Sequence, residues 1–161
     1  MALSLVVLLG PVLLLFLLYQ WVSGGATPAR VDQGPAVHSA QVAGLPATAP
    51  EGLSHGWVPV SAAFQEVEGG LTLRLGYITP EGESVQVVQS SVDVATLLEA
   101  ELGEQARPDG QALLANHTWQ LYRDVRGGPE RALVRREPDR TTIVVGAASS
   151  AELRLLAAVT P

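Results

Sequence analysis

The sequence predicts an α+β fold: an N-terminal transmembrane helix, then two duplicated βββα units that form one antiparallel six-stranded sheet with the helices on one face. Two observations carry this prediction. A stretch of twenty residues near the N-terminus, Leu3–Val22, contains no charged residue. Farther along the 161-residue chain, Phe64–Leu98 aligns with Tyr122–Leu156 without a gap, at an offset of 58 residues. We therefore expect one anchored domain that arose by duplication.

The apolar stretch predicts a membrane span over residues 1–22. At a rise of about 1.5 Å per residue, a helix of this length crosses roughly 30 Å, the thickness of the hydrocarbon layer. Tyr19 and Trp21 fall at one end of the stretch, where amphipathic rings favour the headgroup region. We therefore expect Leu3–Val22 to contact the lipid bilayer. A cleaved signal peptide is the alternative, since Val22–Ala26 offers small residues to a peptidase.

Residues 23–52 are rich in glycine and proline, which predicts a flexible stalk with a candidate short helix over Ala36–Gly44. The α+β domain is expected to occupy residues 53–161, with its repeat halves at about 53–103 and 111–160. Charges beside the apolar stretch do not set the orientation of the chain. Because one anchor followed by a single translocated domain is the common arrangement, we expect a single-pass protein of the cell membrane with an extracytoplasmic C-terminal domain.

Each half contains three predicted strands, because apolar and polar residues alternate there with a period of two. A glycine pair follows the first strand of each half, at residues 69–70 and 127–128. Each pair leads into another strand and not into a helix, so hairpin turns are favoured over phosphate-binding loops. The predicted strands are Trp57–Phe64, Leu71–Ile78, Ser84–Gln89, Thr118–Tyr122, Arg131–Arg135 and Thr141–Gly146.

A helix is expected to close each half. Ser91 with Asp93 marks the start of the first helix, and Ser149 with Glu152, three residues on, has the spacing of a capping box. Gly103 supplies the residue that ends the first helix. Apolar stripes on both helices predict that they pack on the sheet, and these stripes comprise Val94, Leu97, Leu98 and Leu102, and Leu153, Leu156 and Ala157.

Residue types that carry catalysis or bind metals are few and dispersed. The chain has no cysteine, and its histidines, His38, His55 and His117, lack the spacing of metal ligands. The serines near 91 and 149 are explained by helix capping, because no partner base accompanies them. The sequence therefore predicts no catalytic residue, no metal site and no cofactor, and we expect a protein that is not an enzyme.

The two halves differ in charge. Residues 51–109 contain ten acidic residues and two arginines, whereas residues 110–161 contain five acidic residues and seven arginines. Part of the second half is therefore a candidate patch for a partner or an anion, unless its arginines pair with acids of the first half. A formal charge of −6 argues against nucleic acid as a partner. The candidate residues are Arg123, Arg126, Arg131, Arg135, Arg136 and Arg140.

Four aromatic residues on predicted strands are candidates for a pocket between the sheet and the helices, at the junction of the two halves. The alternative is a filled core, which is the commoner role of aromatic residues on strands. The four residues are Trp57, Tyr77, Trp119 and Tyr122.

Seven segments occur together along the domain: Gly56–Phe64, Leu73–Gly82, Val85–Ser90, Thr118–Asp124, Arg131–Arg135, Thr141–Gly146 and Ala151–Ala157. In combination they resemble the landmarks of a group of actinobacterial single-pass membrane proteins whose domain has no assigned function. This resemblance implies an N-terminal anchor and one soluble domain, and it carries no catalytic residues over to the chain.

Two functions are compatible with these observations. The first is a membrane-anchored, non-enzymatic domain of the cell envelope that binds an unknown protein or envelope component through a face or edge of its sheet. The second is a small-ligand-binding or hydrolytic domain whose site lies between the sheet and the helices. A cavity between the sheet and the helices would favour the second function, and a filled core there would favour the first.

Overall fold

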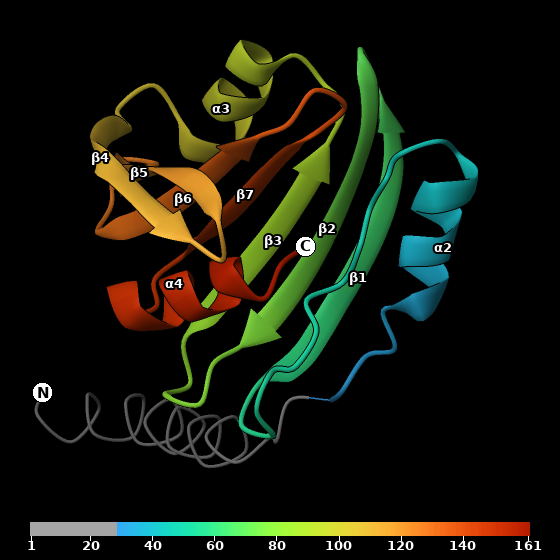
Figure 1. Cartoon of the computed structure of the whole chain (residues 1–161), viewed down its shortest axis with the longest axis horizontal. Helices are drawn as coiled ribbons and strands as arrows, with labels where there is room; N and C mark the ends of the chain where they lie inside the picture. The colour runs from blue at the N-terminus through green and yellow to red at the C-terminus, as the bar shows by residue number, and fades with distance from the viewer. Residues whose placement is uncertain (1–28) are drawn as a thin grey trace, which may run out of the picture.

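The computed structural model describes residues 29–161 of the chain. Within this range no helix is both long enough and apolar enough to cross a membrane. The predicted transmembrane helix over Leu3–Val22 lies outside the described residues. The elements, labelled as in Figure 1, are α2 (Gly34–Val42), β1 (Val58–Val67), β2 (Gly70–Ile78), β3 (Ser84–Ser90), α3 (Val94–Leu102), β4 (Arg107–Leu114), β5 (His117–Val125), β6 (Glu130–Arg136), β7 (Thr141–Gly146) and α4 (Ser150–Ala158).

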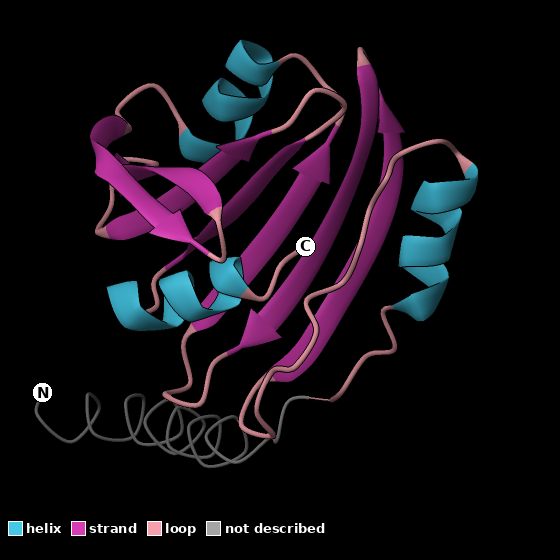
Figure 2. Cartoon of the chain, in the orientation of Figure 1, coloured by secondary structure: helices cyan, strands magenta, loops and turns pink. Residues whose placement is uncertain are grey.

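The strands form one sheet in the order β1-β2-β3-β7-β6-β5-β4, in which all neighbours are antiparallel (Figure 2). The prediction of six strands is therefore wrong, because β4 adds a seventh at one edge. Its sequence contains Pro108 and Gly110, and the register with β5 shifts between Pro108 and Gln111. Proline is tolerated there because an edge strand need not donate every backbone hydrogen bond. The bulge also hides the alternation from which a strand is predicted.

The helices do not share one face of the sheet, which corrects a second part of the predicted fold. Leu153 of α4 belongs to the core cluster that contains Val87, whereas Leu97 of α3 belongs to the cluster that contains Val88. Val87 and Val88 are consecutive residues of β3, and consecutive side chains of a strand point to opposite faces. The helices α3 and α4 therefore cover opposite faces, and α4 lies in front of the sheet in Figure 1.

The pairing of the strands retains a twofold relation between the halves, with β3 beside β7 at its centre. The offset between the halves can be measured along one row of residues that lie directly opposite one another across the strands. In this row, the residue of β5 follows the corresponding residue of β1 by 59 positions, that of β6 follows that of β2 by 58, and that of β7 follows that of β3 by 57. The gapless alignment thus holds for β2 and β6 alone, because each connection in the second half is one residue shorter. The row of directly opposed residues that defines these offsets is Ala62, Leu75, Val87, Val144, Leu133 and Leu121.

Most of the segment for which a flexible stalk is predicted packs on the sheet. The backbone N–H of Val31 donates to the carbonyl of Pro59 over 2.8 Å, beside the edge strand β1. Leu45 and Ala47 are buried in the same core cluster as α4. These contacts place the start of the folded domain near residue 31, well before residue 53. This segment is rich in glycine and proline, yet its apolar side chains are buried because they pack against the face of the sheet that α4 also covers.

Candidate functional site

The four aromatic residues for which a pocket is predicted do not come together around one cavity. Trp57, Tyr77 and Trp119 are buried in the core cluster beneath α4, while Tyr122 packs against the cluster on the opposite face. The Tyr77 hydroxyl donates to Gln33 Oε1 over 2.6 Å, and burial raises the pKa of Tyr77 to about 12. Trp57, Tyr77 and Trp119 therefore fill the core, whereas Tyr122 is only half-buried and lines a hollow that is described below.

The six candidate arginines are divided among separate places. Arg135 and Arg140 turn inward, and each donates to Glu137 Oε2, over 3.1 and 2.9 Å. Both also donate to the carbonyl oxygen of Pro161, so this pair holds the end of the chain against the sheet. Burial disfavours the charged form of Glu137, yet the hydrogen bond from Arg140 and the charges of both arginines hold the pKa of Glu137 below its ordinary value.

The other four arginines lie near the surface. Arg126 forms ion pairs with Glu101 and Glu130, and Arg123 lies 4.0 Å from the carboxylate of its neighbour Asp124. Arg136 is exposed at the end of β6. Arg131 lines a hollow between the sheet and α4.

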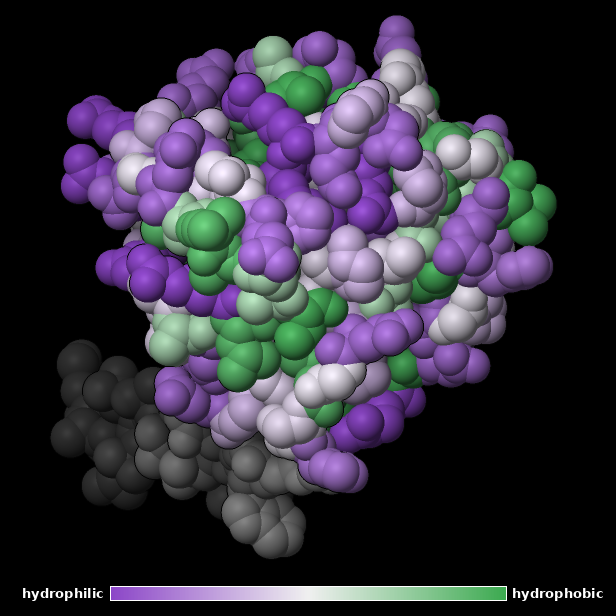
Figure 3. Space-filling model, viewed as in Figure 1, coloured by the Kyte–Doolittle hydropathy of each residue, from purple (hydrophilic) through white to green (hydrophobic). Residues whose placement is uncertain are grey.

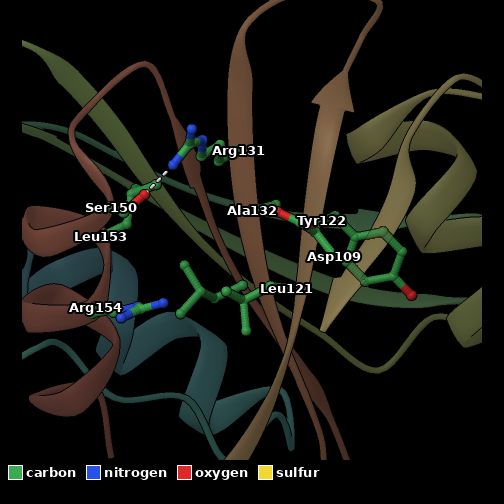
Figure 4. A pocket seen from close by; sticks show the side chains of 9 residues that line it. Asp109, Leu121, Tyr122, Arg131, Ala132, Ser150, Leu153 and Arg154 are labelled. Atoms are coloured by element: carbon green, nitrogen blue, oxygen red, sulfur yellow. Dashed lines mark hydrogen bonds between the residues drawn. The ribbon is translucent and has the colours of Figure 1, made fainter. Parts of the chain in front are cut away.

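That hollow has a volume of about 140 Å³ and lies between α4 and the strands β4, β5 and β6 (Figure 4). Three leucines from three elements, Leu121, Leu133 and Leu153, form its apolar lining, and all three belong to or pack against the first core cluster. Polar side chains line the rest of it, and Figure 4 shows them around the leucines: Asp109, Arg131, Ser150 and Arg154.

Local sequence explains how these side chains meet. Arg131 and Leu133 are two residues apart on β6, so both point to the face that α4 covers. Ser150, Leu153 and Arg154 have the spacing of one helix face. Ala132 and Tyr122 also line the hollow, but both side chains pack against the cluster on the opposite face of the sheet.

Positive charge predominates around the hollow, since two guanidinium groups face one carboxylate, Asp109. Within residues 29–161, no carboxylate lies within 4.0 Å of Arg131 or Arg154. Arg131 donates a hydrogen bond to Ser150 Oγ. An arginine stays protonated and cannot act as a base, so this contact does not activate the serine as a nucleophile. The arrangement is suited to holding an anion.

Sequence reasoning finds part of this site. It marks Arg131 as a candidate for anion binding and Leu153 as an apolar helix position. It misses Arg154, although the spacing from Ser150 to Arg154 signals a shared helix face. It also misses Asp109, because the strand that carries this residue escapes prediction.

The surface around the helix is mixed in character. Figure 3 shows the face seen in Figure 1, where hydrophobic residues gather over α4 and hydrophilic residues surround them. Leu155 of α4 is 47% exposed and contributes to this apolar surface. An apolar group that enters the hollow thus approaches over a surface that is already partly apolar.

Comparison with known proteins gives one match. A protein-family model described as "Protein of unknown function (DUF4245)" matches residues 1–160. No curated protein and no solved structure matches the chain.

Proposed function

Since the chain belongs to the DUF4245 family of proteins of unknown function, we propose a function from its own geometry: a non-enzymatic module that binds a small organic anion between α4 and the sheet. One observation carries the proposal. Arg131 and Arg154 line an apolar hollow, and no carboxylate of residues 29–161 lies within 4.0 Å of either guanidinium group. An arginine side chain that forms no ion pair with a carboxylate of the protein is available to bind an anionic ligand.

The polar side of the hollow favours a carboxylate or a phosphate. A guanidinium group is planar and always charged, and its N–H groups match the oxygens of these anions in pairs. Arg131 also holds Ser150 Oγ, which fixes the direction of its guanidinium group before a ligand arrives. The ligand would therefore meet a donor that is already oriented.

The leucines favour a ligand with a compact apolar part. Leu121, Leu133 and Leu153 present hydrocarbon to the hollow, and burying apolar area there contributes about 25 cal/mol for each Å². A volume of about 140 Å³ is close to that of a protein cavity known to admit a benzene ring. We therefore infer an anion whose apolar part is about the size of one ring or a short alkyl chain.

A membrane location is part of the proposal. The apolar stretch Leu3–Val22, outside the described residues, supports a tether to the lipid bilayer. With the domain held outside the cytoplasm, the ligand would be a component of the cell envelope. The resemblance to actinobacterial single-pass membrane proteins agrees with this placement.

Binding of a matched pair of probes tests the proposal. 4-Fluorobenzoate and 4-fluorobenzamide have the same shape, and only the first is an anion. In ¹⁹F NMR with the purified full chain, we expect the benzoate to bind at least about tenfold more tightly, because only it gains charge-assisted hydrogen bonds.

Three variants locate the binding. Arg131→Gln and Arg154→Gln should each weaken binding of the benzoate about tenfold. Arg136→Gln, which removes an exposed arginine from the same strand as Arg131, should leave it unchanged. Equal binding of the two probes, or an equal effect of all three variants, would show that the hollow is not an anion site.

A further inference from the structure

A second concave surface lies on the opposite face of the sheet, where the two halves of the domain meet. It is a groove of about 240 Å³ lined by residues of β1, β2, β3, β6 and β7 and of the turn between β5 and β6. Val145 at its base belongs to the core cluster on the face covered by α3. The polar side chains that line the groove are Ser61, Ser84, Gln86, Arg126 and Glu130.

The groove is open because β2 has a glycine at Gly76. A Cβ atom at this position would lie 2.2 Å from Ser61 Oγ on the neighbouring strand, so no side chain fits without displacing the serine. The missing side chain leaves the Ser61 hydroxyl and the Gln86 amide accessible from the same space. Each of these groups can both donate and accept a hydrogen bond.

Arg126 is held firmly at one side of the groove. Its backbone has φ of 53°, a left-handed conformation that is unfavourable for a residue with a side chain. Its N–H donates to the carbonyl of Leu102 over 2.6 Å, and its Nε donates to the carbonyl of Glu101 over 3.0 Å. These contacts with the end of α3 stabilise the strained backbone and orient the guanidinium group.

Glu130, beside Arg126, has a carboxylate oxygen without a hydrogen bond. Its Oε2 is buried and accepts none from residues 29–161, and it lies 3.7 Å from Arg126 Nη1, beyond hydrogen-bond distance. The Glu130 side chain as a whole is 32% exposed and lines the groove. The groove therefore presents a carboxylate acceptor next to a charged donor.

The charges around this acceptor cancel. Arg126 and Arg74 both form ion pairs with Glu101, and Arg126 also faces Glu130, so two positive charges balance two negative ones. A balanced site does not select an ion. It favours a neutral ligand that has a donor for Glu130 and an acceptor for Arg126 on adjacent atoms.

We propose that this groove binds a saccharide unit through two adjacent hydroxyl groups. One hydroxyl donates a hydrogen bond to the carboxylate of Glu130, and the next accepts a hydrogen bond from the guanidinium group of Arg126. Ser61 and Gln86 bind further hydroxyls on the other side of the groove. This binding does not depend on the anion hollow, which lies on the other face of the sheet.

Saturation-transfer NMR with the purified full chain tests the proposal. The probe is methyl α-mannopyranoside, which has adjacent hydroxyls, and the control is tetrahydropyran-2-methanol, which has a similar ring and none. We expect saturation transfer to the mannoside and at least about a fivefold weaker signal for the control. Raising the salt concentration should leave the mannoside signal unchanged while it weakens binding of 4-fluorobenzoate in the hollow, which separates the two sites.

Variants decide whether the groove is responsible. Glu130→Gln keeps the size of the side chain and removes the charged acceptor, and Ser61→Phe fills the groove from the exposed face of β1. Both should reduce the mannoside signal at least about fivefold, while Glu66→Gln, an exposed position on β1, should not. Equal signals for probe and control, no signal, or a signal that survives Ser61→Phe would overturn the proposal.

Discussion

The guanidinium carbon of Arg135 lies 5.0 Å from the centroid of the Trp119 indole ring, and both side chains are buried in the protein. A cation over an indole face is attracted by the ring, and the attraction is stronger where water is excluded. Arg135 also donates to the carbonyl of Thr160 over 3.1 Å. One side chain therefore connects the core of the sheet with the segment that follows α4.

Removing this side chain should destabilise the fold. We expect Arg135→Ala to lower the free energy of unfolding by about 3 kcal/mol, because Glu137 loses a partner and the carbonyls lose a donor. Urea unfolding followed by circular dichroism measures the change. Arg136→Ala, the exposed neighbour, should change stability by less than about 0.5 kcal/mol. Similar losses in both variants would contradict a special role for Arg135.

The same cluster predicts a dependence of stability on pH. The pKa of Glu137 is lower in the folded chain than its ordinary value of 4.5, so its ionised form stabilises the fold above that value. This contribution is lost as the pH falls through the folded pKa. The difference in stability between the wild type and Glu137→Gln should thus be constant near neutral pH and shrink below about pH 4.5. Urea unfolding of both proteins at several pH values between about 3 and about 7 measures this difference in stability.

Arg140 provides the control for this dependence. Arg140→Gln removes the hydrogen bond and one of the charges that lower the pKa of Glu137. Its stability should therefore change less between neutral and acidic pH than that of the wild type. An unchanged pH profile in Glu137→Gln would assign the dependence to other carboxylates.

The junction of the halves depends on Gly146, at the end of β7. A Cβ atom there would lie 2.4 Å from the carbonyl oxygen of Ser84 on β3. We expect Gly146→Ala to cost about 2 kcal/mol of stability, because the two central strands must separate to admit the methyl group. Gly128→Ala, where the nearest atom would be 3.7 Å away, should cost much less. Thermal unfolding of both variants compares the two positions, and equal costs would argue against close packing at the junction.

The capping box of α4 makes a separate prediction. The Ser149 hydroxyl accepts a hydrogen bond from the Glu152 N–H, and the Glu152 carboxylate accepts one from the Ser149 N–H. Ser149→Ala should lower the free energy of unfolding by about 1 kcal/mol, because a backbone donor of the first turn loses its partner. Ser54→Ala, in an exposed loop, serves as the control. If both substitutions are neutral under urea unfolding, the box does not stabilise the helix.

Much of the fold can be predicted where local pattern and tertiary environment agree. The strand Thr141–Gly146 has the predicted bounds, because it is buried along its whole length and its residues favour strands. The capping box at Ser149 is a local signal and is found where predicted. The start of α3 differs slightly: Asp93 caps the helix, while Ser91 Oγ accepts from the Leu71 N–H instead.

The candidate site is harder to predict because its residues come from distant parts of the chain. The sequence does not distinguish Arg131 and Arg154 from the arginines that pair with acids. Only the tertiary structure shows that, within residues 29–161, neither forms an ion pair within 4.0 Å. Arg135 has the same residue type as both, yet it is buried over Trp119. Residue type therefore indicates a capacity for binding anions, and burial decides which arginine keeps it.

The sequence by itself determined the periodicities of the elements, the repeat of about 58 residues and the first turn of α4, because these depend on residues close in the chain. Only the tertiary structure decided that β4 joins the sheet edge, that α3 and α4 cover opposite faces and that residues 31–50 pack on the domain. The physical reason is that an apolar stripe specifies burial but not the surface that buries it. The connections between strands are one residue shorter in the second half, so the offset between corresponding residues of the two halves changes from strand to strand. The sequence of a single strand does not reveal this change.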